Sequence, residues 1–221
     1  MERRAFSRDL VDAYLGAVDW LQDILGRGEV REAWARPSVL TDYSVGGLAA
    51  HAVHGVVWLE QLLKDTEPVG LRPLSVFEFF GLNRVEKEGA DPMAASLRSA
   101  AEAFALTGAD AVSAACTASR SELLRLLCGA SSDQAVPVLR VAGGQVALRD
   151  YLRTRVLEVV VHGDDVVCSV PGLTTPDPPL RAMEVSLGVC LELARARVGD
   201  LGTLRGFTRS ERALPDPLRV L

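Results

Sequence analysis

One stretch in the second half of the chain decides the fold: Arg155-Val-Leu-Glu158-Val-Val-Val-His162-Gly-Asp-Asp165. Its residue types give conflicting signals, because the valines are β-branched and favour a strand, and Gly163 is a poor residue inside a helix. A set of polar side chains nevertheless recurs at alternating spacings of four and three residues, as on one face of a helix: Tyr151, Arg155, Glu158, His162 and Asp165. A strand would also place Glu158 and His162 on one face. The pattern therefore favours a helix over residues 149–169 and leaves a strand open.

The spacing of Glu158 and His162 points to metal chemistry. A carboxylate and an imidazole one helical turn apart can bind the same divalent metal, with a third ligand from elsewhere in the chain. The chain has three histidines, and the other two, His51 and His54, lie together far upstream. A lone histidine on an apolar helix face is more often a hydrogen-bonded core residue. The hypothesis is a metal site built from His51, Glu158 and His162.

The composition is that of a globular protein with a sizeable core. The chain has 221 residues, of which 48% are hydrophobic and 24% charged, and this length predicts one domain or one domain with an appendage. The net charge is -5 and the arginines are scattered, so we do not expect a nucleic-acid partner.

The sequence also indicates in which cellular compartment the protein lies. No apolar run approaches the roughly 18–20 residues that span a bilayer. The charged start of the chain is not followed by the apolar region of a signal peptide. The four cysteines are far apart and form no CxxC pair, as expected for reduced, buried side chains. We therefore expect a cytoplasmic protein without a membrane segment.

Apolar periodicity predicts a mainly helical chain. Ser44 is the expected N-cap of the second helix, although Gly47 stands where a capping box would have an acidic residue. Gly108 is expected to kink or break one long helical stretch, and Gly143-Gly144 predicts a β-hairpin. The expected helices cover residues 7–27, 44–65, 75–88, 91–127, 149–169 and 180–198.

Two segments resemble the DinB-like, mycothiol-dependent maleylpyruvate isomerase family of actinobacteria. The first, Ser44-Val-Gly-Gly-Leu-Ala-Ala-His51, resembles the second-helix pattern of that family, which ends in a histidine. The second is Asp150-Tyr-Leu-Arg-Thr-Arg155-Val-Leu-Glu158-Val-Val-Val-His162-Gly-Asp-Asp165-Val, which resembles its fourth-helix signature. A glutamate and a histidine at this spacing are common, but the arginine, the aspartate and the upstream histidine together are fairly specific. The resemblance covers roughly residues 7–170.

The resemblance implies a fold and a domain organisation. The fold class is expected to be mainly all-α, a DinB-like four-helix bundle with a small β-hairpin before the fourth helix and an extra C-terminal helix. Residues 149–169 are then a helix rather than a strand. The expected parts are a metal-binding bundle over residues 1–170, a Pro-rich linker over 171–179, and a helix and tail packed on the bundle over 180–221.

The resemblance also implies a ligand set. Members of the family hold a divalent metal, usually zinc, and the matching ligands here are His51, Glu158 and His162; this donor set also suits nickel, iron or manganese. Arg155 and Asp165 lie one turn away on the same stripe. We expect them to orient the ligands, with an internal ion pair or a solvated helix edge as the alternative. His54 is expected to be a neighbour of the site rather than a ligand.

Three protein ligands leave zinc an open position, which is typical of catalytic sites. We expect a mycothiol-dependent transferase or isomerase in which the metal activates the thiol toward a small electrophile. The alternatives are a non-catalytic metal-binding bundle with a structural or stress-related role, and a helical interaction protein without metal. DinB-like proteins often pair through their bundles, so a homodimer is also expected. Full-length members carry a further α/β domain, for which residues 171–221 are too few, so maleylpyruvate isomerisation itself is not expected.

Overall fold

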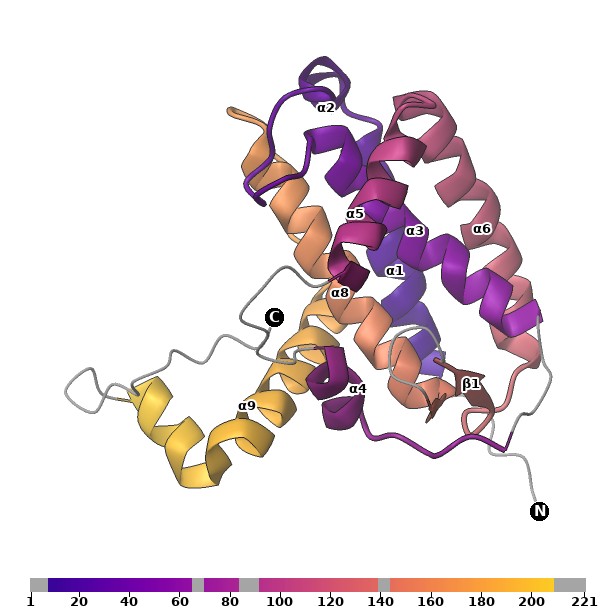
Figure 1. Cartoon of the computed structure of the whole chain (residues 1–221), viewed down its shortest axis with the longest axis vertical. Coiled ribbons are helices and arrows are strands. Elements are labelled where there is room, and N and C mark those ends of the chain that lie inside the picture. The colour runs from indigo at the N-terminus through magenta and orange to yellow at the C-terminus, as the bar shows by residue number, and fades with distance from the viewer. Residues whose placement is uncertain (1–7, 65–69, 84–91, 139–143, 209–221) are drawn as a thin grey trace.

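The structure, a computed structural model, describes residues 8–64, 70–83, 92–138 and 144–208, and it is mainly helical, which confirms the expected fold class (Figure 1). The helices are α1 (Arg8–Leu25), α2 (Gly28–Ala33), α3 (Val45–Lys64), α4 (Val76–Asn83), α5 (Pro92–Ala105), α6 (Ala109–Gly129), α8 (Leu148–Ser169) and α9 (Leu180–Thr208). A two-stranded antiparallel hairpin is formed by β1 (Ala135–Pro137) and β2 (Gln145–Ala147).

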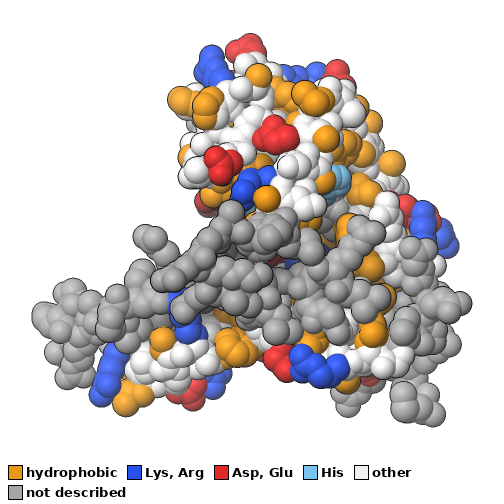
Figure 2. All heavy atoms as spheres, in the orientation of Figure 1, with side chains coloured by type: hydrophobic (Ala, Val, Ile, Leu, Met, Phe, Trp, Pro, Cys, Tyr) orange, Lys and Arg blue, Asp and Glu red, His pale blue; other side chains and the backbone are white. Residues whose placement is uncertain are grey.

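Four of these helices form the bundle. Helix α1 packs against α6 and α8, and α3 packs against the same two helices from the other side. Helix α5 covers α3, and α9 lies against α1 and α8, outside the bundle (Figure 1). On the face drawn in Figure 2, acidic and basic side chains are interspersed among apolar ones. No helix in the described part of the chain combines the length and apolar character that crossing a bilayer requires.

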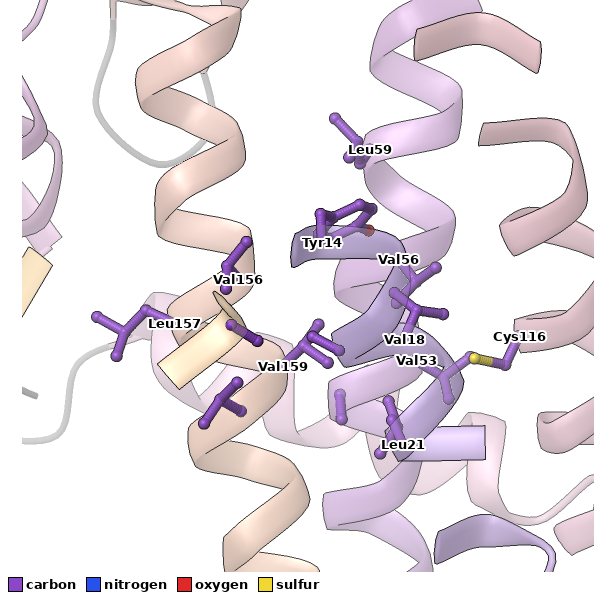
Figure 3. Close-up of a cluster of buried hydrophobic side chains, with 14 of the residues drawn as sticks. Tyr14, Val18, Leu21, Val53, Val56, Leu59, Cys116, Val156, Leu157 and Val159 are labelled. Carbon is purple, nitrogen blue, oxygen red and sulfur yellow. The ribbon is translucent and has the colours of Figure 1, made fainter. Parts of the chain in front are cut away.

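The core of the bundle follows from the apolar stripe of α1. Tyr14, Val18 and Leu21 recur at helical spacing and are fully buried. Figure 3 shows them between side chains of α3 and α8, among them Val56 and Val156. Burying a side chain of this size stabilises the fold by about 1.5–3 kcal/mol. This core holds α3 and α8, which carry the candidate site, next to each other.

Residues 149–169 form a helix, as the resemblance implied, and the strand alternative is wrong. Val156, Leu157 and Val166 are each at most 1% exposed in α8, because its apolar sides face α1, α3 and α9. Residue preferences for helix or strand differ by only tenths of a kcal/mol, so this burial outweighs them. The β-branched composition of the stretch therefore reflects packing on several sides of one helix.

Gly163 marks the closest approach of α1 to α8. A Cβ atom at this position would lie 2.3 Å from the ring of Trp20. The ring has little freedom to move, because its Nε1–H donates a hydrogen bond to the carbonyl oxygen of Pro176 over 2.8 Å. Gly163 thus stands in α8 because α1 needs the space, in spite of its poor helix propensity.

The start of α3 is capped from another helix. Ser44 is the N-cap, as predicted, and its hydroxyl accepts a hydrogen bond from the Gly47 N–H over 2.8 Å. Glu102 of α5 accepts hydrogen bonds from the Ser44 N–H (2.7 Å) and the Ser44 hydroxyl (2.9 Å). A Cβ at residue 47 would lie 1.9 Å from the Glu102 carboxylate. A capping box would have an acidic residue at position 47, and here Glu102 of α5 supplies the carboxylate instead. Gly47 leaves room for that carboxylate, because it has no side chain.

Several expected boundaries shift. Helix α2 was not predicted, because the expected helices leave a gap between residues 27 and 44. The break at Gly108 is confirmed, with φ at 94°, and it separates α5 from α6. The last helix continues beyond residue 198 to Thr208, across a bend at Gly199 where φ is 74°. The hairpin is confirmed by pairing of Val136 with Val146.

Some predictions fall outside the described residues. Gly143 of the expected hairpin turn is one of them, and so are the end of the helix expected over residues 75–88 and the tail from residue 209.

The Gly163 contact gives a stability prediction. Gly163→Ala is expected to lower the free energy of unfolding by about 1–3 kcal/mol, because the added methyl group overlaps the Trp20 ring. Gly188→Ala in α9 is the matched control, since nothing lies within 4 Å of its Cβ position. It is expected to leave stability unchanged or raise it by up to about 1 kcal/mol. Urea denaturation of both variants checks this, and equal effects would show that the contact with Trp20 costs nothing.

Candidate metal centre

The packing of α3 against α8 brings His51 and His162 together. Their ring centroids are 4.8 Å apart and their planes are nearly perpendicular, at 78°. The two residues are far apart in the sequence, so only the bundle brings them into contact. Two of the three predicted ligands are therefore neighbours in space.

The third predicted ligand and the predicted aspartate both contact His162. Its Nε2 lies 3.1 Å from Oε2 of Glu158, and its Nδ1 lies 3.2 Å from Oδ2 of Asp165. The side chains of His162 and Glu158 are 17% and 25% exposed, so the group is sheltered without being closed off from solvent. Asp165 therefore contacts Nδ1 of the imidazole, and Glu158 contacts Nε2. This is the arrangement expected of an aspartate that orients a histidine.

Arg155 lies on the same stripe but contacts Glu158 only loosely. Its Nη2 is 3.9 Å from Oε1 of Glu158, which is an ion pair too long to be a hydrogen bond. Its Nε–H donates to the Thr154 hydroxyl over 3.2 Å. The guanidinium lies near the rings of Tyr151 and Phe79, at 5.0 and 5.8 Å from their centroids. Aromatic faces and a hydroxyl therefore hold this arginine more closely than the carboxylate does.

The two histidines have opposite electrostatic environments. Burial lowers the pKa of His51 to about 4, and the charge of His162 contributes to that shift. Burial also disfavours the charged form of His162, but hydrogen bonds to Asp165 and Glu158 outweigh it and raise the pKa to about 9. For Glu158, burial favours the neutral acid, and the hydrogen bond from His162 with the charge of Arg155 lowers the pKa to about 2. Without metal, the site holds a neutral His51 beside a charged pair.

Aromatic side chains lie beside the histidines and beside Arg155, and sequence reasoning missed two of them. The Tyr43 ring lies 5.6 Å from that of His51, from the residue just before the N-cap of α3. Phe79 of α4 lies beside Arg155 and Tyr151, and no sequence signal connects it with the site. His54 stacks on Phe104 of α5, with centroids 5.0 Å apart. It flanks the histidine pair from the same helix as His51, in the position of a neighbour.

The distances between the candidate ligands show how far they suit a metal. In the described part of the chain, no group of three or more His, Cys, Asp or Glu side chains is arranged around a metal position. Instead, Nε2 of His162 and the Glu158 carboxylate are hydrogen-bonded to each other. Tetrahedral zinc at its usual bond lengths separates a nitrogen and an oxygen ligand by about 3.3 Å. The observed 3.1 Å is close to that value, so the spacing of these two donors suits a shared divalent metal.

Comparisons with known proteins give one match. Residues 21–167 match the family model described as the mycothiol maleylpyruvate isomerase N-terminal domain. The matched region contains the whole of α3 and all five of the polar stripe residues of α8. No curated protein and no solved structure matches the chain.

The charged pair predicts a pH dependence for the metal-free protein. The pKa of His162 rises on folding from 6.5 to about 9, so its contribution to stability is complete below pH 6.5 and is lost as the pH rises through about 9. His162→Gln is expected to abolish this loss. His51 is neutral in the folded protein throughout this window, but its imidazole takes up protons near pH 6.5 once the chain is unfolded, so it adds a rise in stability with pH up to about pH 7.5 that both proteins share. Glu158 is ionised in both states and adds no slope. Urea denaturation of both proteins from pH 6 to pH 10 measures the difference, and parallel profiles would contradict the assigned pair.

Proposed function

The chain belongs to the family of the mycothiol maleylpyruvate isomerase N-terminal domain, and on that premise we propose that it binds a divalent metal and acts on a low-molecular-weight thiol and a small electrophile. The observation that supports this most is the meeting of His51, Glu158 and His162 between α3 and α8, within the matched residues. The proposed metal is zinc, and the proposed thiol is mycothiol, after the name of the family.

The three side chains would serve as the metal ligands, and the charges around them suit this role. The low pKa of His51 keeps its imidazole neutral near pH 7, so a nitrogen lone pair is available. His162 must lose a proton before it can bind a metal, so metal binding releases a proton. Glu158 is ionised at all pH values of interest.

Asp165 prepares His162 for that role. When the imidazole is neutral, its Nδ1–H donates to the Asp165 carboxylate, and the lone pair is then on Nε2. Nε2 is the atom that faces Glu158. Asp165 therefore selects the tautomer and the ring orientation that a metal shared with Glu158 requires.

A metal held by three protein ligands has a position free for a thiol and would lower the pKa of that thiol. The side chains around the ligands would bind and orient the two reactants. Tyr43 and Phe79 offer aromatic surface, and Arg155 offers a cationic side chain 3.9 Å from the Glu158 carboxylate. The reaction proposed is addition or transfer of the thiol to a small electrophile.

A second function has one observation in its favour. Glu158 and His162 already satisfy each other through a direct hydrogen bond, as in a structural ion pair. A bundle that binds metal only structurally, or not at all, would keep this pair for stability. The two experiments that follow separate these functions.

Metal content tests the ligand set. The wild-type chain, reconstituted with Zn²⁺, is expected to hold one metal ion per chain by elemental analysis. His51→Ala, Glu158→Ala and His162→Ala are each expected to lose it, because two remaining ligands bind too weakly. His54→Ala is the matched control and should keep the metal, since its ring stacks on Phe104 at the flank. Wild-type protein that takes up no stoichiometric metal would refute the site.

Thiol binding tests the catalytic function. Mycothiol added to the Co²⁺-substituted protein is expected to produce a sulfur-to-metal absorption band in the near ultraviolet. The same titration with an alcohol analogue of the thiol should give no such band. A folded, metal-loaded protein whose spectrum mycothiol leaves unchanged would favour the structural function. Loss of the fold on metal removal, with no effect of thiol, would do so as well.

A further inference from the structure

The guanidinium of Arg155 is sheltered but has no close acidic partner in the described part of the chain. Its side chain is 15% exposed, and its ion pair with Glu158 spans 3.9 Å. The carboxylate of Glu158 is engaged by His162 at 3.1 Å, so it is not free to turn toward the arginine. A sheltered charge normally has hydrogen-bonded counter-charges, and here they are absent from the described residues.

The guanidinium is held in place by other means. The rings of Tyr151 and Phe79 lie at 5.0 and 5.8 Å, and such aromatic contacts stabilise a cation without using its N–H donors. Nε–H is used by the Thr154 hydroxyl, which in turn donates to the carbonyl of Tyr151 over 2.6 Å. Within the described residues, the two terminal nitrogens make no hydrogen bond and have donors for a ligand. The arginine is thus oriented before any ligand arrives.

The helix opposite leaves space beside this group. Gly55 of α3 faces Arg155, and a Cβ built there would lie 3.9 Å from Nη1. Because glycine has no side chain, α3 presents only backbone to the guanidinium at this point. Any larger residue at position 55 would extend into the space beside Nη1.

A second buried polar group near Arg155 also lacks a partner. The Tyr14 hydroxyl is fully buried and has no hydrogen-bond partner among the described residues. Figure 3 shows Tyr14 between Val156 of α8 and Val56 of α3, the two helices that flank the guanidinium. Burial raises the pKa of Tyr14, and the charge of Arg155 acts against that shift, as expected for groups close to each other. Buried hydroxyls usually have hydrogen-bond partners. The Tyr14 hydroxyl is therefore a hydrogen-bonding group that no described side chain uses.

We propose that Arg155 binds a carboxylate group of the small electrophile through its two terminal nitrogens. A planar carboxylate matches the planar fork of a guanidinium and accepts two parallel hydrogen bonds from it. A phosphate dianion would concentrate its charge on one group close to Glu158 and Asp165, whereas a dicarboxylate spreads a similar charge over two groups, so a carboxylate is favoured. The binding of a carboxylate follows from Arg155 and its surroundings alone. Its assignment to the electrophile rests on the proposed function.

The test is calorimetric titration of maleate, a planar dicarboxylate, into the metal-free full chain. Metal is removed with the uncharged chelator 1,10-phenanthroline, because a carboxylate chelator would compete for Arg155. Wild-type protein is expected to bind maleate saturably, and to bind neither its diamide nor inorganic phosphate comparably. Arg155→Gln is expected to weaken maleate binding roughly tenfold or more, and Arg155→Lys by less, since lysine keeps the charge and loses the fork.

Two further variants control this result. Arg153→Gln is the matched control and should bind maleate like the wild type, because Arg153 pairs with Asp150 and Glu192 on the outside of α8. Gly55→Val should weaken binding with Arg155 intact, because its methyl groups fill the space beside Nη1. It tests the proposal even if Arg155→Gln fails to fold.

The outcomes separate this proposal from the metal site. His51→Ala should lose the metal and keep maleate binding. Equal maleate affinity in wild type and Arg155→Gln, no saturable binding by folded wild type, or equal binding of phosphate would each overturn the proposal. Loss of metal in Arg155→Gln with maleate binding unchanged would show that Arg155 only positions Glu158. Displacement of maleate by mycothiol would assign the arginine to the thiol and would overturn the assignment to the electrophile.

Discussion

The structure depends on burying a charged stripe of α8 inside a helical bundle. Charged groups taken out of water are costly unless they compensate one another. Here Glu158 and Asp165 both contact His162, and this pairing raises the pKa of His162 and lowers that of Glu158. Arg155 completes the row, supported by aromatic rings more than by an acid. The sheltered charges of the bundle are therefore compensated by contacts with one another and with aromatic rings.

Two contacts outside the stripe hold the group in register. Gly163 lets the Trp20 ring pack against the backbone of α8, which sets how α8 lies on α1. At the other helix, Glu102 of α5 caps the first turn of α3 through Ser44, seven residues before His51. Both contacts fix the helices that carry the ligands, and neither involves a ligand. They explain why two glycines, at positions 47 and 163, stand in helices that would otherwise gain from alanine.

The sheltered site favours the chemistry expected of the family. A neutral His51 and an oriented His162 offer nitrogen donors, and an ionised Glu158 offers oxygen. The same shelter would strengthen any interaction of Arg155 with an anionic ligand, since electrostatic interactions weaken in contact with water. Two of the proposed metal ligands and the proposed carboxylate donor thus lie within two turns of α8, and the third ligand lies opposite them on α3. A thiol and an acidic electrophile could meet there.

Much of this was predictable from local sequence. Apolar periodicity placed the helices, Gly108 marked a break, Ser44 marked an N-cap, and the spacing of Glu158, His162 and Asp165 placed them on one face. Other features were not predictable, because they depend on contacts between distant segments. No local sequence signal shows that Glu102 supplies the acid of the α3 cap or that Trp20 requires a glycine at position 163. None shows that Tyr43 and Phe79 lie beside the site.

The sequence by itself pointed to the residues that are proposed to carry the chemistry, and it determined how they are spaced along each helix, because that spacing follows from helix geometry alone. It left the choice between helix and strand at residues 149–169 to the family resemblance, since a glutamate and a histidine four residues apart share a face in both. Only the tertiary structure decided that His51 meets His162 and that Arg155 stands apart from Glu158. The physical reason is that these distances are set by how α3 and α8 pack in the bundle, which no segment of the chain determines alone.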